Sequence, residues 1–339
     1  MLLKRLAGLT CAGLLAGCAI GLSAASASAA TIQGAGSTLV APIEAEWAAA
    51  FDSATGDTIN YNPVGSGTGE KDIASGLTDF GASDAPLSVY SNVPGNLVQI
   101  PWALTATGVS YHLRGISRLH LTGTVLAAIY VGQIKNWSDS RIKALNPHTN
   151  LPNLPITVFW RSDGSGDTYA FTRYESDVSP TFKKTIGAST TVSWPVGQGR
   201  KGNTGLAQAI AQTNGGIAYI AVSYLVADNL PAVSIKNAAG RYIVPNLGAI
   251  EAAAQVVHAV PSNNEVTIVN PPRGARTAYP IATFTYVILP THPAQGGVLK
   301  QFINYALTGG QQFGPRLDFA PLPRGVKNAA LSTLNRISG

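Results

Sequence analysis

The chain has 339 residues, a formal net charge of +6 and only 12% charged residues. This length is enough to bury a large apolar core and to form two lobes. The basic excess includes no dense run of lysine or arginine, which argues against nucleic-acid binding. Both cysteines, Cys11 and Cys18, lie near the N-terminus, so the rest of the chain has neither a disulfide nor thiol chemistry.

Residues 1–30 are predicted to be an export signal. A short basic start is followed by the apolar run Leu6–Leu22, which is short for a spanning helix, and by the small residues Ser23–Ala30. Two processing alternatives remain open. Ala27-Ser28-Ala29 fits ordinary signal peptidase and a soluble periplasmic product, which we favour because small residues precede it. Leu15-Ala16-Gly17-Cys18 fits a lipobox, which would leave a lipoprotein anchored through Cys18.

Short apolar strands then alternate with helical segments, which predicts an α/β fold with a mainly parallel sheet. The predicted strands are Thr31–Gly36, Thr58–Tyr61, Asp79–Ser83, Thr107–Leu113, Ile156–Trp160, Gly216–Ile220 and Ile281–Leu289. The predicted helices are Leu39–Phe51, Glu70–Leu77, Thr122–Val131, a segment from Thr168, Asn246–Val257 and Pro293–Leu307. A hairpin is expected between Val233–Ile235 and Tyr242–Val244.

The stretch Arg161–Thr168, Arg-Ser-Asp-Gly-Ser-Gly-Asp-Thr, follows an apolar strand and opens a predicted helix. Glycines at such a junction let backbone N–H groups converge, and a helix start adds free N–H donors. Arg161 supplies a planar fork of donors for an oxyanion. The stretch therefore predicts an anion site, in which the acids Asp163 and Asp167 need an explanation.

Three other loops combine glycine with a hydroxyl or carboxylate group near a strand end. They are Gly34–Thr38, Gly65–Gly69 and Gly81–Asp84. One such loop alone is usually an ordinary turn that binds no ligand, and its serine or threonine usually caps a helix. Ligands of α/β sheets bind at the carboxyl ends of strands, so four loops of matching polarity favour one shared site.

Three of these stretches, Gly34–Thr38, Asp79–Leu87 and Arg161–Gly166, together resemble the phosphate-binding subunit of the Pst ABC phosphate importers. Further counterparts in the same order are Tyr130–Trp137, Lys201–Gly205 and Tyr279–Ile281. The resemblance runs from Thr31 nearly to the C-terminus. It implies a periplasmic-binding-protein-like fold of type II, in which two α/β lobes surround a hinged cleft.

The resemblance also implies how the chain is divided. Residues 31–104 and 279–339 would form lobe I, and residues 105–278 would form lobe II. The chain would cross between the lobes near Trp102–Ala106 and Thr277–Pro280, and closure would enclose one inorganic phosphate. The implied partners are the inner-membrane permease and the ATPase of an ABC transporter. The protein itself would be a monomer without a cofactor or metal.

The residues that match the family's phosphate-binding positions are Thr38, Leu39, Ser66, Asp84, Arg161, Ser165, Gly166 and Asp167. Leu39 replaces the usual phenylalanine, but this position contributes its backbone N–H. Asp167 replaces the threonine of many members and matches a Gly-Ser-Gly-Asp-Thr variant of the motif found in others.

Elementary chemistry agrees with phosphate as the ligand. Phosphate near neutral pH carries at least one proton, whereas sulfate carries none, and a carboxylate can accept a hydrogen bond only from a protonated oxygen. In a dry cleft, Asp84 would meet an unprotonated sulfate oxygen at a cost of several kcal/mol, on the order of 10⁴-fold in affinity. Asp84 is therefore expected to make the site selective for phosphate.

Each remaining residue of the Arg161 stretch has two interpretations. Asp167 either accepts a second proton, which would favour the doubly protonated phosphate monoanion, or caps the helix that starts at Thr168. Arg161 and Asp163 could be an ordinary surface ion pair. Within this motif we expect Arg161 to bind phosphate, with Asp163 orienting its guanidinium group from behind.

Two other functions compete with phosphate transport. An exported phosphatase needs a nucleophile with a base or a metal cluster, and the sequence has neither a G-x-S-x-G elbow nor an H-E-x-x-H motif. The five histidines have no metal-ligand spacing. Binding of another oxyanion, such as sulfate or molybdate, would keep the fold, but Asp84 argues against a fully ionised ligand.

Overall fold

The computed structural model describes residues 29–338. The predicted export signal, including both cysteines, lies almost entirely outside these residues. In the described part of the chain, no helix is both long enough and apolar enough to cross a membrane.

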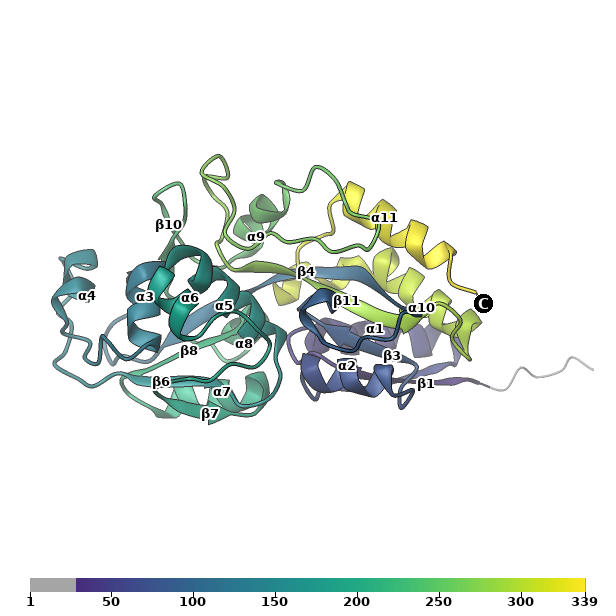
Figure 1. Cartoon of the computed structure of the whole chain (residues 1–339), viewed down its shortest axis with the longest axis horizontal. Helices are drawn as coiled ribbons and strands as arrows, with labels where there is room; N and C mark the ends of the chain where they lie inside the picture. The colour runs from purple at the N-terminus through teal and green to yellow at the C-terminus, as the bar shows by residue number, and fades with distance from the viewer. Residues whose placement is uncertain (1–28, 339) are drawn as a thin grey trace, which may run out of the picture.

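Two α/β lobes lie side by side and share one long sheet (Figure 1). The strands are β1 (Thr31–Gly36), β2 (Thr58–Asn62), β3 (Phe80–Ser83), β4 (Leu97–Tyr111), β5 (His120–Thr122), β6 (Thr157–Arg161), β7 (Gln198–Arg200), β8 (Gly216–Ala221), β9 (Ser234–Lys236), β10 (Tyr242–Ile243) and β11 (Ala282–Pro290). The main sheet has eight strands in the order β2-β1-β3-β11-β4-β8-β6-β7, and a smaller sheet has the order β10-β9-β5.

The α-helices cover both lobes. They are α1 (Ala41–Thr55), α2 (Ser66–Ala74), α3 (Gly123–Tyr130), α4 (Ser140–Leu145), α5 (Gly166–Val178), α6 (Pro180–Thr185), α7 (Gly202–Gln212), α8 (Val222–Ala227), α9 (Leu247–Ala254), α10 (Gly296–Leu307) and α11 (Arg324–Asn335). Helices α1, α10 and α11 pack together on the first lobe, while α3, α5 and α6 pack together on the second.

Strand β4 joins the two lobes. Up to Ala106 it pairs antiparallel with β11, and from Thr107 onward it pairs antiparallel with β8. Nearly every residue of β4 is buried, so the same strand is a central core element in both halves of the sheet. The backbone near Ala106 and Thr107 is therefore a continuous, hydrogen-bonded connection between the lobes.

One strand prediction was wrong. The strand predicted over Thr107–Leu113 is β4, which begins at Leu97 and ends at Tyr111. The prediction missed its first half because Pro101 resembles a strand terminator, but β4 pairs irregularly with β11 at this point, where a strand tolerates proline. The main sheet is mixed. The pairs β1–β2, β1–β3, β6–β7 and β6–β8 are parallel, as predicted for most of the sheet, whereas the central pairs β3–β11, β11–β4 and β4–β8 are antiparallel.

Each lobe has an aromatic core. In the first lobe, the rings of Trp47 and Trp102 lie 5.1 Å apart, and Trp47 Nε1 donates a hydrogen bond to the Gly310 carbonyl at 2.8 Å. In the second lobe, Phe171 of α5 stacks on Tyr219 of β8 with centroids 4.7 Å apart. Helix α5 is thereby held firmly against the sheet at the position where its N-terminus meets the first lobe.

Replacing Trp47 by alanine should destabilise the protein by about 3–5 kcal/mol, because a fully buried ring and the hydrogen bond to Gly310 are both lost. Urea unfolding measures the free energy directly. Leu77→Ala is the matched control, since the Leu77 side chain is 72% exposed and its loss should change stability by less than about 0.5 kcal/mol. Equal effects of the two substitutions would contradict the assigned core.

Candidate functional site

The four glycine-rich loops meet between the lobes. On the first lobe, the Ser37 N–H donates to the Ala82 carbonyl at 2.9 Å and the Gly65 N–H donates to the Gly36 carbonyl at 2.7 Å. The second lobe approaches through Arg161–Gly166. The Gly67 N–H donates to the Gly164 carbonyl at 3.0 Å, which brings the two lobes into direct contact.

Asp84 is the acceptor group contributed by the first lobe. Its carboxylate is almost completely buried and accepts hydrogen bonds from Ser37 Oγ at 2.7 and 2.6 Å. Ser66 Oγ lies 3.3 Å from Asp84 Oδ2 and accepts a hydrogen bond from the Gly166 N–H of the other lobe at 3.0 Å. A Cβ atom at Gly166 would clash with the Asp84 side chain, so only glycine allows this approach.

Arg161 is the cation contributed by the second lobe. Strand β6 ends at this residue, and its guanidinium group is almost fully buried. Nε donates to Asp163 Oδ1 at 2.8 Å, Nη2 forms an ion pair with Asp163 Oδ2, and Nη1 donates to Asp167 Oδ2 at 3.1 Å. Asp163 also accepts the Gly202 N–H at 3.0 Å, so the guanidinium group is held by a carboxylate that is itself fixed.

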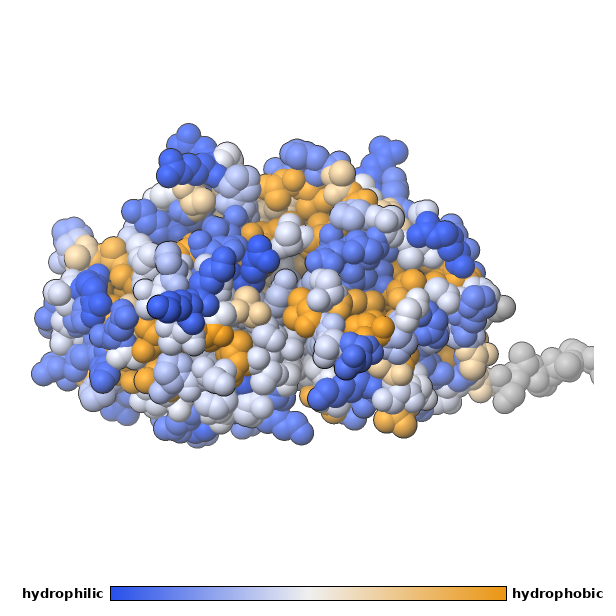
Figure 2. Space-filling view, viewed as in Figure 1, coloured by the Kyte–Doolittle hydropathy of each residue, from blue (hydrophilic) through white to orange (hydrophobic). Residues whose placement is uncertain are grey.

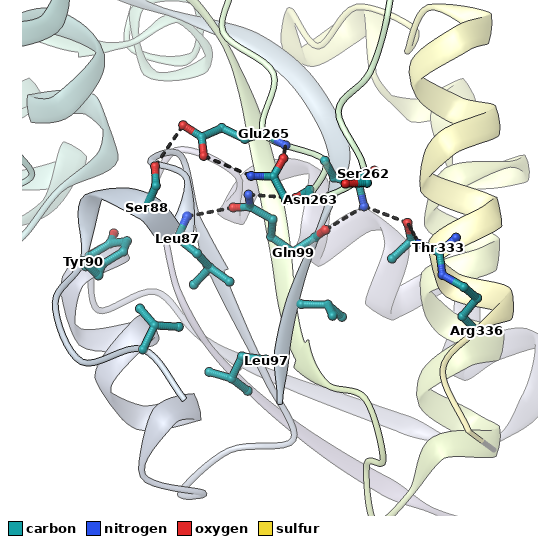
Figure 3. A pocket seen from close by; sticks show the side chains of 13 residues that line it. Leu87, Ser88, Tyr90, Leu97, Gln99, Ser262, Asn263, Glu265, Thr333 and Arg336 are labelled. Atoms are coloured by element: carbon teal, nitrogen blue, oxygen red, sulfur yellow. Dashed lines mark hydrogen bonds between the residues drawn. The ribbon is translucent and has the colours of Figure 1, made fainter. Parts of the chain in front are cut away.

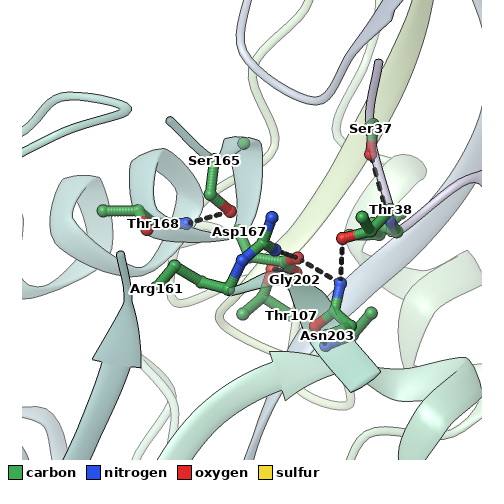
Figure 4. Close-up of polar contacts among 12 residues, drawn as sticks. Ser37, Thr38, Thr107, Arg161, Ser165, Asp167, Thr168, Gly202 and Asn203 are labelled. Carbon is green, nitrogen blue, oxygen red and sulfur yellow. Dashed lines mark hydrogen bonds and ion pairs between the residues drawn. The ribbon is translucent and has the colours of Figure 1, made fainter. Parts of the chain in front are cut away.

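Asp167 connects both lobes through its neighbours (Figure 4). Its Oδ1 accepts from Thr107 Oγ1 at 2.7 Å, and its Oδ2 accepts from Asn203 Nδ2 at 2.8 Å as well as from Arg161. The same Asn203 amide donates to Thr38 Oγ1 of the first lobe at 2.9 Å. We call Asp84, Arg161, Asp163 and Asp167 the interlobe cluster.

The alternative that Asp167 caps the helix is wrong. Helix α5 begins at Gly166, and its N-cap is Ser165, which has extended backbone angles and accepts the Thr168 N–H on Oγ at 3.3 Å. The Asp167 carboxylate is directed at the cluster instead. The Ser165 hydroxyl can still donate its own proton, because capping uses only its oxygen as an acceptor.

The other predicted site residues lie beside the cluster. Thr38 and Leu39 follow β1, and the Leu39 N–H donates to Ser37 Oγ at 3.0 Å while its side chain is buried in the core. Helix α2 begins at Ser66, four residues before the predicted start at Glu70, so Ser66 belongs to a helix N-terminus and not to a free loop.

Sequence reasoning missed three residues whose side chains donate to the carboxylates of the cluster: Ser37, Thr107 and Asn203. Ser37 and Asn203 lie in stretches that carried the family resemblance, so their surroundings gave a signal. Thr107 gave none, because nothing local distinguishes it from any other strand threonine. Its contact with Asp167 depends on β4 passing beside the N-terminus of α5.

Burial and mutual repulsion set the proton affinities in the cluster. Burial and the nearby Asp167 raise the pKa of Asp84 from 3.8 to about 7, although the hydrogen bonds from Ser37 and the charge of Arg161 oppose the shift. Burial also raises the pKa of Asp167 against the opposing charge of Arg161. Burial alone would raise the pKa of Asp163, but its bonds to Arg161 outweigh burial and lower it.

A cavity of about 460 Å³ on the first lobe is a competing location (Figure 3). Its polar side chains bond mainly to one another and to the backbone. Gln99 Nε2 donates to the Asn263 carbonyl at 3.0 Å, and Asn264 Nδ2 donates to Thr333 Oγ1 at 2.8 Å. Its two charged residues, Glu265 and Arg336, bond to the hydroxyl groups of Ser88 at 2.9 Å and of Thr333 at 3.1 Å. The cavity lies within one lobe and lacks the paired glycine-rich loops that meet at the interlobe cluster.

Comparison with known proteins places this geometry in a family. The chain matches the PBP superfamily domain over residues 22–309. It is 35% identical over 301 residues to the phosphate-binding protein PstS of Pasteurella multocida, covering 87% of each chain. It is 34% identical to the phosphate-binding protein PstS of Haemophilus influenzae, covering 88% of this chain and 91% of that one.

The chain belongs to the PstS family. The predicted family is thereby confirmed. A solved phosphate-binding protein from Stenotrophomonas maltophilia has the same fold, with a TM-score of 0.67 at 20% identity over 90% of this chain and 94% of that one. The type II fold of two α/β lobes around a cleft is also confirmed.

The interlobe cluster predicts that the free energy of unfolding of the protein depends on pH in phosphate-free buffer. The folded-state pKa of Asp84 lies above its unfolded value, so the folded state holds a proton between about pH 4 and 7. The stability from this proton is fully present below about pH 4 and is lost as pH rises through about 7. Asp84→Asn should reduce this loss by about 4 kcal/mol, because the folded and unfolded pKa values lie about three pH units apart.

Urea unfolding at both ends of that pH range would measure the effect. Asp52→Asn on the exposed surface of α1 is the control, and it should retain the full pH dependence of the unsubstituted protein. An Asp84→Asn protein that loses as much stability with rising pH as the control would contradict the raised pKa.

Proposed function

We propose that the protein binds inorganic phosphate between its lobes and delivers it to an ABC importer. One observation carries the proposal: the lobes bring a buried cation, several hydroxyl and backbone N–H donors, and the carboxyl group of Asp84, which only accepts hydrogen bonds when ionised, to the same point. Named relatives that are 34–35% identical are phosphate-binding proteins, which supports the same ligand here.

The ligand set would divide between the lobes. Thr38, Ser66, the Leu39 N–H and Asp84 would bind from the first lobe, and Arg161, Ser165, the Gly166 N–H and Asp167 would bind from the second. Each hydroxyl and N–H would donate to one phosphate oxygen, for which the Leu39 N–H would give up its bond to Ser37 Oγ and the Gly166 N–H its bond to Ser66 Oγ. Asp84 would accept the phosphate proton, and Asp163 would orient Arg161. The contacts between Gly67 and Gly164 support a closed form in which the lobes meet.

The lobe boundaries are part of the proposal. Residues 31–104 and 279–339 would move as one body against residues 105–278. The change of partner along β4, from β11 to β8 after Ala106, supports a crossing close to this point. The second crossing would precede β11. Small backbone rotations at the two crossings would open the cleft without breaking either core.

Transport requires partners outside the chain. We propose that the protein is exported by its N-terminal signal, acts in the periplasm as a monomer, and meets a permease and its ATPase at the inner membrane. Attachment through Cys18 would be the alternative to a soluble form. No step in this function makes or breaks a covalent bond, so a chromogenic phosphate ester should remain intact in the presence of the protein.

Asp84→Asn should weaken phosphate binding by about 10- to 100-fold, because the acceptor of the phosphate proton becomes partly a donor. Sulfate binding should be less affected, so selectivity should fall. Isothermal titration calorimetry with phosphate and sulfate gives both values, with Asp52→Asn as the control. No phosphate binding by the unsubstituted protein, or undiminished selectivity in Asp84→Asn, would overturn the assignment.

A second titration tests the proposed role of Asp167. If Asp167 accepts a proton from the doubly protonated monoanion, phosphate affinity should rise several-fold as pH falls from about 8 to about 6. Asp167→Asn, which keeps the shape of the side chain, should abolish that rise. An affinity that stays flat or falls in the unsubstituted protein would leave Asp167 with a purely electrostatic role toward Arg161.

A further inference from the structure

A second group of cations lies outside the cleft, where a hairpin meets a loop. The hairpin joins β9 and β10 through Asn237–Gly240, and the loop Arg273–Arg276 precedes β11 (Figure 1). Together they surround a depression of about 520 Å³, lined by Ala238, Ala239, Gly240, Arg273, Gly274 and Arg276. We call it the arginine depression.

The charge at this position is uncompensated. Arg273 and Arg276 line the depression, and the exposed Lys236 and Arg241 flank the hairpin turn. Within residues 29–338, none of these four side chains lies within 4.0 Å of a carboxylate as part of an ion pair. Hydrophilic side chains cover the protruding hairpin in Figure 2. Four nearby cations without acids create a positive potential that attracts anions.

The frame of the depression is rigid because of one buried amide. Asn237 Nδ2 donates to the carbonyls of Arg276 and Ala278, both at 3.1 Å, which ties the hairpin to the loop. Asn237 Oδ1 accepts the Arg241 N–H at 3.1 Å, and its own N–H donates to the Arg241 carbonyl at 2.8 Å. The backbone that carries the arginines is therefore fixed before any ligand arrives.

The shape and chemistry select among anions. Two guanidinium groups on one concavity match phosphate oxygens in a bidentate manner. A single orthophosphate would gain little from exposed pairs, whereas a chain of phosphates can contact several cations at once. A flat lipid surface cannot enter a concavity. The depression also contains no carboxylate, so it does not require a protonated oxygen as Asp84 does.

We propose that the arginine depression is a second anion site, which binds a linear condensed phosphate such as pyrophosphate or tripolyphosphate. Arg273 and Arg276 contact the phosphate groups, and Lys236 and Arg241 add long-range attraction. The site is independent of the interlobe cluster, because none of the residues lining the depression belongs to the four loops of the cleft.

The test is titration of tripolyphosphate into the full protein in magnesium-free buffer with saturating orthophosphate, which occupies the cleft. Binding should be observed, and the combined Arg273→Ala and Arg276→Ala substitutions should weaken it by at least about 10-fold. The control is Lys183→Ala with Lys184→Ala, which removes the same charge from the exposed end of α6 and should leave affinity unchanged within about 2-fold.

Asn237→Ala separates a built site from diffuse attraction. It keeps all four cations but frees the loop, so affinity should fall several-fold while orthophosphate binding in the cleft changes little. The melting temperature should fall by only a few degrees, because the carbonyls of Arg276 and Ala278 lose one donor. Equal weakening in the arginine and lysine variants would overturn the proposal. Tripolyphosphate binding that orthophosphate abolishes would also overturn it, because such binding takes place in the cleft. Binding of anionic vesicles through these arginines, without binding of tripolyphosphate, would overturn it as well.

Discussion

The packing of three carboxylates, two of them buried and one partly buried, around one guanidinium group is the constraint on which the cleft depends. Arg161 pairs with Asp163 and Asp167, and Asp167 in turn raises the proton affinity of Asp84. This arrangement carries more negative than positive charge when all groups are ionised, so it is unfavourable without protons or further donors. The loop hydroxyls and N–H groups supply those donors. Asn203 and Thr107 are needed for the same reason, since each satisfies an acceptor of Asp167 that would otherwise be buried without a partner.

The sheet determines how far Asp84 of one lobe lies from Arg161 and Asp167 of the other. Asp84 follows β3 of the first lobe, whereas Arg161 ends β6 of the second, and β4 lies between their halves of the sheet. Opening at β4 would therefore separate Asp84 from Asp167 and lessen the repulsion that raises the pKa of Asp84. In the proposed opening and closing of the lobes, this geometry would link proton binding at Asp84 to closure: the free cleft would close more readily with a proton on Asp84. A phosphate that supplies its own proton would replace that requirement.

Much of this arrangement was present in the local sequence, and the remainder arose from tertiary packing. Glycine-rich turns at strand ends located the four loops correctly because glycine and hydroxyl residues mark such turns wherever they occur. The first half of β4 was missed because Pro101 resembles a strand terminator unless the irregular pairing with β11 is known. Asp167 was ambiguous because a carboxylate at a helix start can cap or project inward, and the extended backbone of Ser165 decides between them. Thr107 could not be found, since only the course of β4 brings it to Asp167.

The cleft and the arginine depression differ in the one feature that governs anion selectivity. A site that contains a buried acceptor discriminates by protonation, because an anion without a proton leaves that acceptor unpaired in a dry environment. A site made only of exposed donors discriminates by the charge of the anion and by the number of donors that the anion can contact at once. Salt screens the attraction at such a site. The two sites can therefore lie on one protein without competing for the same ion. Under the two proposals, orthophosphate would carry the proton that Asp84 accepts but too little charge for exposed arginines, whereas a condensed phosphate would carry enough charge to contact several arginines at once.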